Sequence, residues 1–171
     1  IVLAARRADA AVADNVAPAN PLIGVMLPYA PLHHLLAGAA GRPVVMTSGN
    51  LSEEPLAYRN DEALERLGGI ADLFLLHDRD IDTRCDDSVA RVIAGAPAVL
   101  RRSRGHVPHG IAAPGFFDEP VLACGALLKN TFCVGAAGMA HLGPHIGDLE
   151  NVETFEAYEH AIARMERFVG V

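Results

Sequence analysis

Short apolar runs separated by polar, glycine-rich and proline-rich stretches mark most of the chain. Runs of four to eight residues rich in Val, Ile and Leu are typical of buried strands. Ala94-Gly95 separates two of these runs and predicts a tight turn. The pattern predicts strands over residues 21–27, 44–46, 73–76, 89–93, 97–100, 121–124 and 131–134.

Helical signals occur at three places in the chain. A helix is predicted just after Pro31, which suits a first helical turn, and Gly38 and Gly41 are predicted to end it. Asn60 is predicted to be the N-cap of a second helix that ends at residues 68–69. The third helix is predicted from apolar residues at spacings of three and four, namely Phe155, Tyr158, Ile162, Met165 and Val169.

Strands and helices alternate throughout, so the predicted fold class is α/β or α+β. The composition changes over residues 103–120, which contain little periodicity and several Pro and Gly residues. We therefore expect a domain boundary near residues 114–119, with one domain over residues 1–115 and another over residues 119–171.

The charge balance excludes some classes of function. The chain has 171 residues, 51% of them hydrophobic, and a net charge of −7 from 14 basic and 21 acidic residues. A general nucleic-acid surface needs clustered excess Lys and Arg, so this balance argues against RNA binding. No apolar run reaches the length of a membrane span, and no signal peptide is visible.

Three cysteines without a C-x-x-C pair predict neither a disulfide framework nor a zinc ribbon. Cys124 and Cys133 have no activating base beside them in the sequence, so we interpret them as structural thiols of a cytoplasmic protein. Because the chain starts at Ile1 rather than Met, we expect it to be a piece of a longer protein.

The loop at residues 47–50, Thr-Ser-Gly-Asn, follows a predicted strand. Its glycine allows close backbone approach and its side chains donate hydrogen bonds, which suits a phosphate or carboxylate ligand. An ordinary turn explains the same residues, and composition alone favours the turn.

Three arginines gather near the end of a predicted strand, at Arg101, Arg102 and Arg104. Guanidinium groups bind phosphate in bidentate fashion, although a solvated loop that offsets nearby acids fits equally well. Asp86 and Asp87 have the oxygen ligands that Mg²⁺ prefers, but an exposed turn is the favoured interpretation.

His141 and His145 have the spacing that would place two imidazoles on one helix face, with Asp148 three residues on. Gly143-Pro144 lies between them and disfavours a helix. We therefore reject a helical metal motif at this position.

Several segments, taken together and in order, resemble HypF-type carbamoyltransferases. The match spans nearly the whole chain. It comprises residues 27–36, 45–55, 77–81, 84–89, 100–105, 123–125, 129–132 and 145–151.

The resemblance implies that residues 1–115 form the later part of a YrdC-like domain, a twisted sheet with helices that binds ATP and makes an acyl adenylate. The Thr-Ser-Gly-Asn loop is similar to the Thr-Ser-Ala-Asn motif of that superfamily. The residues implied as nucleotide or carbamate contacts are Ser48, Asn50, Ser88, Arg101 and Arg102.

The same resemblance implies that residues 119–171 begin a transferase domain with the actin-like (ASKHA) fold. Its opening strands lie near nucleotide in related proteins, which makes Lys129, Asn130 and Thr131 candidate nucleotide contacts. His145 and Asp148 belong to a matching segment but receive no role from it.

The implied reaction joins carbamate, released from carbamoyl phosphate, to ATP with Mg²⁺, and passes the carbamoyl group to the C-terminal cysteine of HypE in [NiFe]-hydrogenase maturation. Zinc and the metal of the transferase domain are expected only in other parts of the parent protein, and the isolated chain is expected to be inactive. Two alternatives stay open: an O-carbamoyltransferase of small-molecule biosynthesis, and an RNA-binding or threonylcarbamoyl-AMP synthase-type module.

Overall fold

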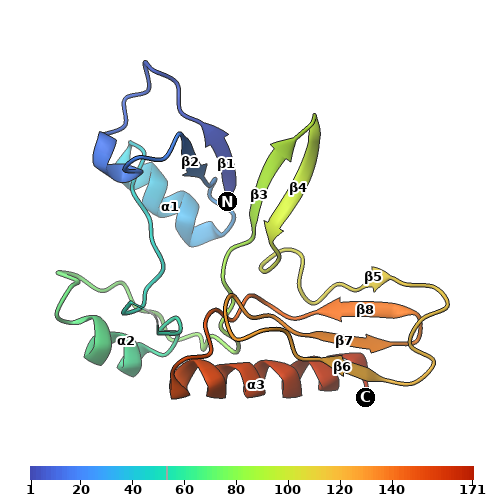
Figure 1. Cartoon of the computed structure of the whole chain (residues 1–171). Coiled ribbons are helices and arrows are strands. Elements are labelled where there is room, and N and C mark those ends of the chain that lie inside the picture. Colours follow the sequence, from blue (N-terminus) through green and yellow to red (C-terminus); the bar gives the residue numbers. More distant parts are fainter. Residues whose placement is uncertain (53) are drawn as a thin grey trace. The chain divides into compact units, whose positions relative to one another are not determined.

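The computed structural model describes residues 1–52 and 54–171, which form two compact units (Figure 1). The first unit contains residues 1–47 and 89–100, and the second contains residues 48–88 and 101–171. Glu53, which belongs to one of the matching segments, lies outside the described residues. Helices and two four-stranded sheets occur together, which confirms a mixed α/β fold.

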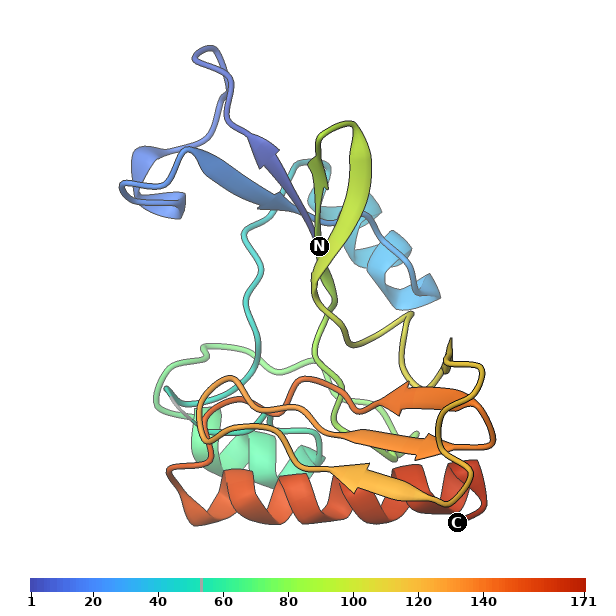
Figure 2. The same ribbon diagram turned by 45° about the vertical axis from the view of Figure 1, so that its right-hand side comes forward.

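The first unit is built on a sheet with the strand order β2-β1-β3-β4 (Figure 1 and Figure 2). Strand β1 runs antiparallel to β2 and parallel to β3. A short 3-10 helix, η1, and one α-helix, α1, complete the unit. The bounds are β1 Val2–Ala5, η1 Asp14–Val16, β2 Leu22–Val25, α1 Pro31–Ala40, β3 Val89–Ile93 and β4 Ala96–Arg101.

The strands predicted over residues 21–27, 89–93 and 97–100 are confirmed, and so is the turn at Ala94-Gly95. Both turn residues have positive φ angles, 49° and 79°, as a tight hairpin connection requires.

Helix α1 begins at Pro31 as predicted, because a missing N–H costs nothing in the first turn. Gly41 ends it in the left-handed conformation and donates its N–H to the carbonyl of Ala37. The prediction that Gly38 also ends this helix is wrong, because Gly38 lies inside it.

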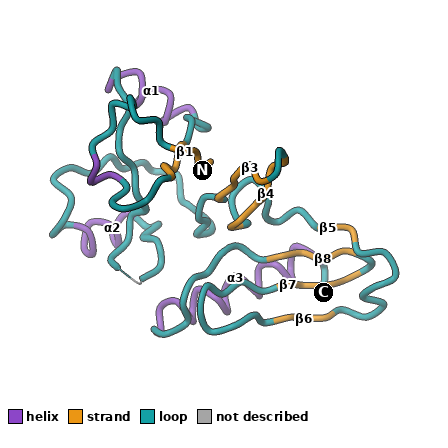
Figure 3. Tube along the Cα trace, turned by 45° about the horizontal axis from the view of Figure 1, so that its top comes forward, coloured by secondary structure: helices purple, strands orange, loops and turns teal. Residues whose placement is uncertain are grey.

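Two predicted strands, residues 44–46 and 73–76, are wrong, because both runs are loop (Figure 3). Their side chains are largely exposed; Val45 is 78% exposed and Leu73 is 91% exposed. An apolar run becomes a strand only where a neighbouring strand accepts its backbone hydrogen bonds. Within the described part of the chain, neither run has such a neighbour.

Helix α2, Asn60–Leu67, belongs to the second unit and ends before Gly68, as the sequence predicts. Its N-cap position is Arg59 rather than the predicted Asn60. The Asn60 amide instead donates to the carbonyl of His77 at 2.8 Å, which ties the helix to a distant loop.

The second unit has an antiparallel sheet with the order β5-β8-β7-β6, and α3 runs along it (Figure 2). The predicted strands 121–124 and 131–134 correspond to β6 and β7, and β7 starts two residues later than predicted. The predicted boundary at residues 114–119 falls in the loop between β5 and β6, yet β5 pairs with β8. The bounds are β5 Ile111–Ala112, β6 Val121–Ala123, β7 Cys133–Ala136, β8 Met139–Leu142 and α3 Val152–Val169.

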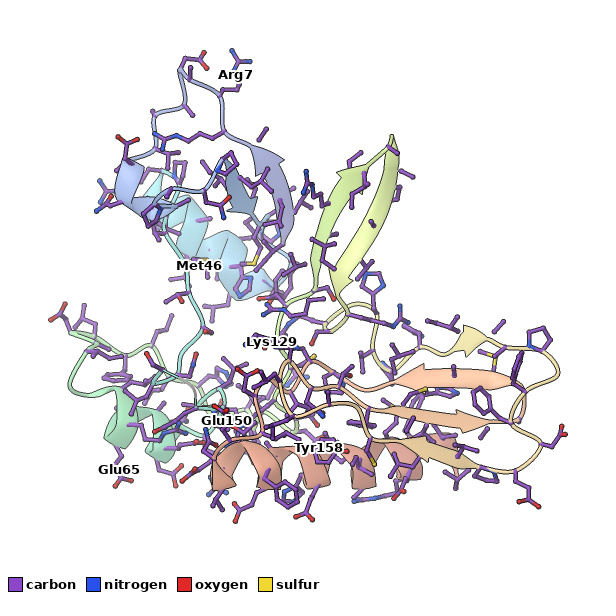
Figure 4. The ribbon with its side chains drawn as sticks, in the orientation of Figure 1. Arg7, Met46, Glu65, Lys129, Glu150 and Tyr158 are labelled. Carbon is purple, nitrogen blue, oxygen red and sulfur yellow. The ribbon has the colours of Figure 1, made fainter. Side chains whose placement is uncertain are left out.

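The buried core of the second unit joins α3 to this sheet, with Tyr158 on the sheet side of the helix (Figure 4). Phe132 and Tyr158 meet edge to face, with ring centroids 5.9 Å apart, beside Val134 and Met165. The Tyr158 hydroxyl donates to the carbonyl of Cys124 at 3.1 Å. Burial and this hydrogen bond raise the pKa of Tyr158 to about 12.

The predicted apolar face of α3 is shifted slightly around the helix. Thr154, Tyr158 and Met165 are its buried residues, whereas Phe155, predicted to be on this face, is 47% exposed. Asn151 caps the helix by accepting the Thr154 N–H at 2.7 Å.

Two glycines allow aromatic rings to lie directly on the backbone of this unit. A Cβ at Gly143 would lie 2.4 Å from the Phe132 ring, and one at Gly135 would lie 2.3 Å from the Phe117 ring. Any larger residue would displace these rings, so both positions require glycine for packing.

Replacing Phe132 by Ala is expected to lower the free energy of unfolding of the second unit by about 3–5 kcal/mol, because a fully buried ring leaves a cavity. Denaturant unfolding followed by circular dichroism measures this change. Phe116→Ala is the matched control, because that ring is 66% exposed. Equal losses in the two variants would contradict the assignment of this core.

Candidate functional site

A cavity of about 300 Å³ lies within the second unit. The loop with Ser48 and Asn50, residues 82–86 and Arg101 line it. Residues 144–146 and part of α3 line it as well. Segments from both halves of the sequence therefore line one cavity.

The predicted anion loop reaches this cavity through Ser48 and Asn50. The Asn50 amide donates to the carbonyls of Leu51 at 2.8 Å and Glu54 at 3.1 Å, which closes the loop on itself. Ser48 is exposed and lines the cavity.

Arg101 is held at the cavity wall by its own neighbours. Its Nε donates to the carbonyl of Asp87 at 2.9 Å, and its Nη1 lies 3.8 Å from the carboxylate of Asp86. These contacts hold the guanidinium group in position, and Arg101 lines the cavity.

A second guanidinium group at the same cavity belongs to Arg84, which the sequence reasoning missed. Its Nε donates to the carbonyl of Leu56 at 2.7 Å, and its Nη2 lies 3.2 Å from Glu62. The group also lies over the Tyr58 ring, 4.6 Å from the centroid. The only signal in the sequence was its position within the matching segment 84–89.

The predicted arginine cluster is divided in the structure. Arg102 donates to the carbonyls of His106 at 3.1 Å and His109 at 2.9 Å. Arg104 donates to the carbonyl of Cys85 and pairs with Asp87 at 3.3 Å. Of the three predicted arginines, Arg101 alone is among the described residues that line this cavity, because successive residues of an extended chain point to opposite sides.

Asp86 and Asp87 pair with Arg101 and Arg104 and are half-buried, so the favoured interpretation of an exposed turn is wrong. The structure contains no group of three or more His, Cys, Asp or Glu side chains that could hold a metal ion, within residues 1–52 and 54–171.

Ser88 lies outside the cavity lining and forms a clamp between two segments. Its hydroxyl donates to the carbonyl of Arg104 at 2.9 Å and accepts the N–H of Ser103 at 2.8 Å. Ser103 is completely buried, so this N–H depends on the hydroxyl for a hydrogen bond.

Ser88→Ala is therefore expected to destabilise the second unit by about 1–3 kcal/mol, because it leaves a buried donor unsatisfied. Thermal or denaturant unfolding measures the loss. The exposed Ser52→Ala is expected to stay within about 0.5 kcal/mol of the parent chain. A Ser88→Ala variant as stable as Ser52→Ala would show that Ser88 is not a clamp.

A second cavity of about 380 Å³ adjoins the start of α3 and is lined by Lys129, Asp148 and Asn151. The Lys129 ammonium lies 2.8 and 3.0 Å from the two carboxylate oxygens of Asp148. The backbone N–H of Lys129 also donates to one of these oxygens, at 2.7 Å. Lys129 thereby holds the pKa of the Asp148 carboxyl below its usual value.

Asn130 and Thr131 stabilise the loops beside Lys129. The buried Asn130 amide donates to the carbonyls of Cys124 and Ala126, at 3.2 and 2.5 Å. The Thr131 hydroxyl lies 3.0 Å from the carbonyls of both Gly143 and Pro144. Neither side chain is among the described residues that line the two cavities, so both act as braces.

His145 lines both cavities and is half-buried. Burial lowers the pKa of its imidazole, and Arg101 and Lys129 lower it further, while Asp86 and Asp148 oppose them. His141, its partner in the H-x3-H pattern, lies in β8 and contacts the carbonyl of Pro108 at 3.2 Å. The prediction that this pattern is not helical is confirmed, because His141 lies in a strand and His145 in a loop.

The folded chain should lose stability in acid partly through His145. Because its folded pKa lies below the unfolded value of about 6.5, the unfolded chain binds more protons, and stability falls as the pH drops through 6.5. We expect His145→Gln to lose less stability than the parent chain between pH 7.5 and 5.5 in denaturant unfolding. The exposed His109→Gln should follow the parent chain, and identical curves for both variants would contradict this expectation.

Comparison with known proteins finds relatives that share the sequence of this chain. Residues 1–103 match the Sua5_yciO_yrdC family, described as telomere recombination, and residues 117–171 match the HypF Kae1-like domain. Carbamoyltransferase HypF of Synechocystis is 43% identical over 98% of this chain, and that of Rhodobacter capsulatus is 49% identical over 88%. This chain belongs to the HypF carbamoyltransferase family.

Solved HypF structures have the same fold. The crystal structure of full-length HypF in the phosphate- and nucleotide-bound form matches 97% of this chain at 45% identity, with a TM-score of 0.92. HypF of T. kodakarensis matches 98% at 42% identity, also with a TM-score of 0.92.

The chain spans only part of these HypF proteins. It covers 22% and 20% of the Synechocystis and Rhodobacter relatives, and 26% of the nucleotide-bound structure. The resemblance seen in the sequence is confirmed. No helix in the described part of this HypF-family chain has the length and apolar character needed to cross a membrane.

Proposed function

We propose that this chain contributes the carbamate-adenylating site of a carbamoyltransferase, and that the first cavity receives MgATP and carbamate. The observation that carries the proposal is the convergence of the Ser48–Asn50 loop with Arg84 and Arg101 on one cavity. Two guanidinium groups beside a hydroxyl suit a polyphosphate.

In the proposed reaction a carbamate oxygen attacks the α-phosphorus of ATP. The bond to the β-phosphate oxygen breaks, pyrophosphate leaves, and carbamoyl-adenylate forms. Arg84 and Arg101 offset the phosphate charge and Ser48 positions the reacting groups, while Asn50 holds the loop in shape through its hydrogen bonds to Leu51 and Glu54. Mg²⁺ enters as part of the nucleotide substrate and is held by its phosphates.

Transfer then requires an acceptor thiol. Its sulfur attacks the carbonyl carbon of carbamoyl-adenylate, AMP leaves, and the thiol proton passes to solvent. We propose the C-terminal cysteine of HypE as this acceptor, as part of [NiFe]-hydrogenase maturation, because the relatives are HypF carbamoyltransferases rather than small-molecule O-carbamoyltransferases. Carbamoyl phosphate would supply the carbamate elsewhere in the parent protein.

Binding of MgATP to this chain tests the adenylation site without requiring turnover. Calorimetry is expected to show that Arg101→Ala weakens binding about 10- to 100-fold, since a hydrogen bond to a charged group contributes about 1.5–3 kcal/mol. Arg91→Ala, an exposed residue of β3 outside the cavity, should leave affinity unchanged. Equal affinities of the parent chain and Arg101→Ala would reject the proposed site.

A further inference from the structure

His145 occupies a position that the proposed adenylation chemistry does not use. It lines the first cavity together with Ser48 and Arg101, although it comes from the segment matching the HypF Kae1-like domain. It also lines the second cavity with Lys129. One imidazole is thus shared by both cavities.

The backbone on both sides of His145 is fixed. The carbonyls of Gly143 and Pro144 accept from the Thr131 hydroxyl, and the Gly143 N–H donates to the carbonyl of Phe132 at 2.8 Å. On the other side the Ile146 N–H donates to the carbonyl of Asn130 at 2.9 Å. The imidazole is therefore presented by a braced loop rather than by a free one.

Burial is the largest cause that lowers the pKa of this imidazole, and charged groups on both sides of it also act on it. Arg101 and Lys129 oppose its protonation, while Asp86 and Asp148 favour it. Each carboxylate already faces one of these cations, at 3.8 Å for Asp86–Arg101 and 2.8 Å for Lys129–Asp148. Burial and these two cations together lower the pKa of the ring.

Other titratable groups line the first cavity near this ring. Glu54 is paired with Arg66, and Asp82 is paired with Arg164 of α3. His160 of α3 is exposed at the cavity wall. Arg84, paired with Glu62, lines this cavity as well. An anionic ligand placed against Arg84 and Arg101 adds negative charge beside this ring. That charge favours an imidazolium at His145.

We propose that His145 is a ligand-contacting residue of the first cavity, and that a phosphate-bearing nucleotide binds there together with one proton taken from solvent onto the imidazole. The proposal rests on the proposed function, because it requires the cavity to accept an anion. The ring then donates one hydrogen bond more to the ligand than a neutral imidazole can.

Proton-linked binding has a measurable consequence. Affinity for MgATP should rise as the pH falls from 8 to 6, by up to about tenfold for each pH unit over which the proton is fully taken up. A purely structural role for His145 would not produce this pH dependence.

The experiment is calorimetric titration of this chain with MgATP at pH 7, in Pipes and in Tris, whose ionisation enthalpies differ. The parent chain and the exposed control His109→Gln are expected to take up the same fraction of a proton. His145→Gln is expected to lose most of that uptake and the rise in affinity at lower pH. Unchanged uptake in His145→Gln would overturn the proposal.

A measurement without substitution guards against misfolding of the variant. The ring signals of His145 in ¹⁵N-labelled parent chain should titrate at higher pH with MgATP present than without it, and an unchanged titration would also overturn the proposal. Binding that depends on Arg101 but takes up no proton at His145 rejects this inference alone. Absence of MgATP binding to the parent chain rejects the proposed function and this inference together.

Discussion

The packing of Phe132 against Tyr158 holds the second unit together. Phe132 is almost fully buried, and its ring lies directly on the backbone of Gly143. Tyr158 in turn connects α3 to the loop after β6 through the carbonyl of Cys124. This contact fixes the loop before His145 and the helix beside it, and both line the first cavity.

Most polar residues near the cavities stabilise the frame rather than face a ligand. Ser88 clamps a buried N–H, Asn130 and Thr131 brace two loops, and Arg102 donates to loop carbonyls. Buried backbone groups need partners, and short polar side chains supply them where no strand is adjacent. Residues that match a functional family can thus act by positioning those that face the cavity.

The positive charges at the cavity have acidic side chains beside them. Arg84 and Arg101 both face it, yet each has an acidic partner nearby, Glu62 for Arg84 and Asp86 for Arg101. Such pairing holds the guanidinium groups in place before a ligand arrives, so less freedom is lost on binding. It also explains how a chain with a net charge of −7 places two arginines at one cavity.

Local pattern in the sequence was enough to predict the hairpin at residues 89–100, helix α1 with its Pro31 start, and the amphipathic α3, because short-range sterics and periodicity decide these elements. The family and the Ser48–Asn50 loop were also recognisable from sequence. Tertiary structure alone decided the rest. It left residues 44–46 and 73–76 as loop, since strands depend on partners distant in the chain. It placed Arg102 outside the cavity lining and brought Arg84 and His145 into it. The direction of a side chain and the residues around it depend on how segments distant in the sequence pack together.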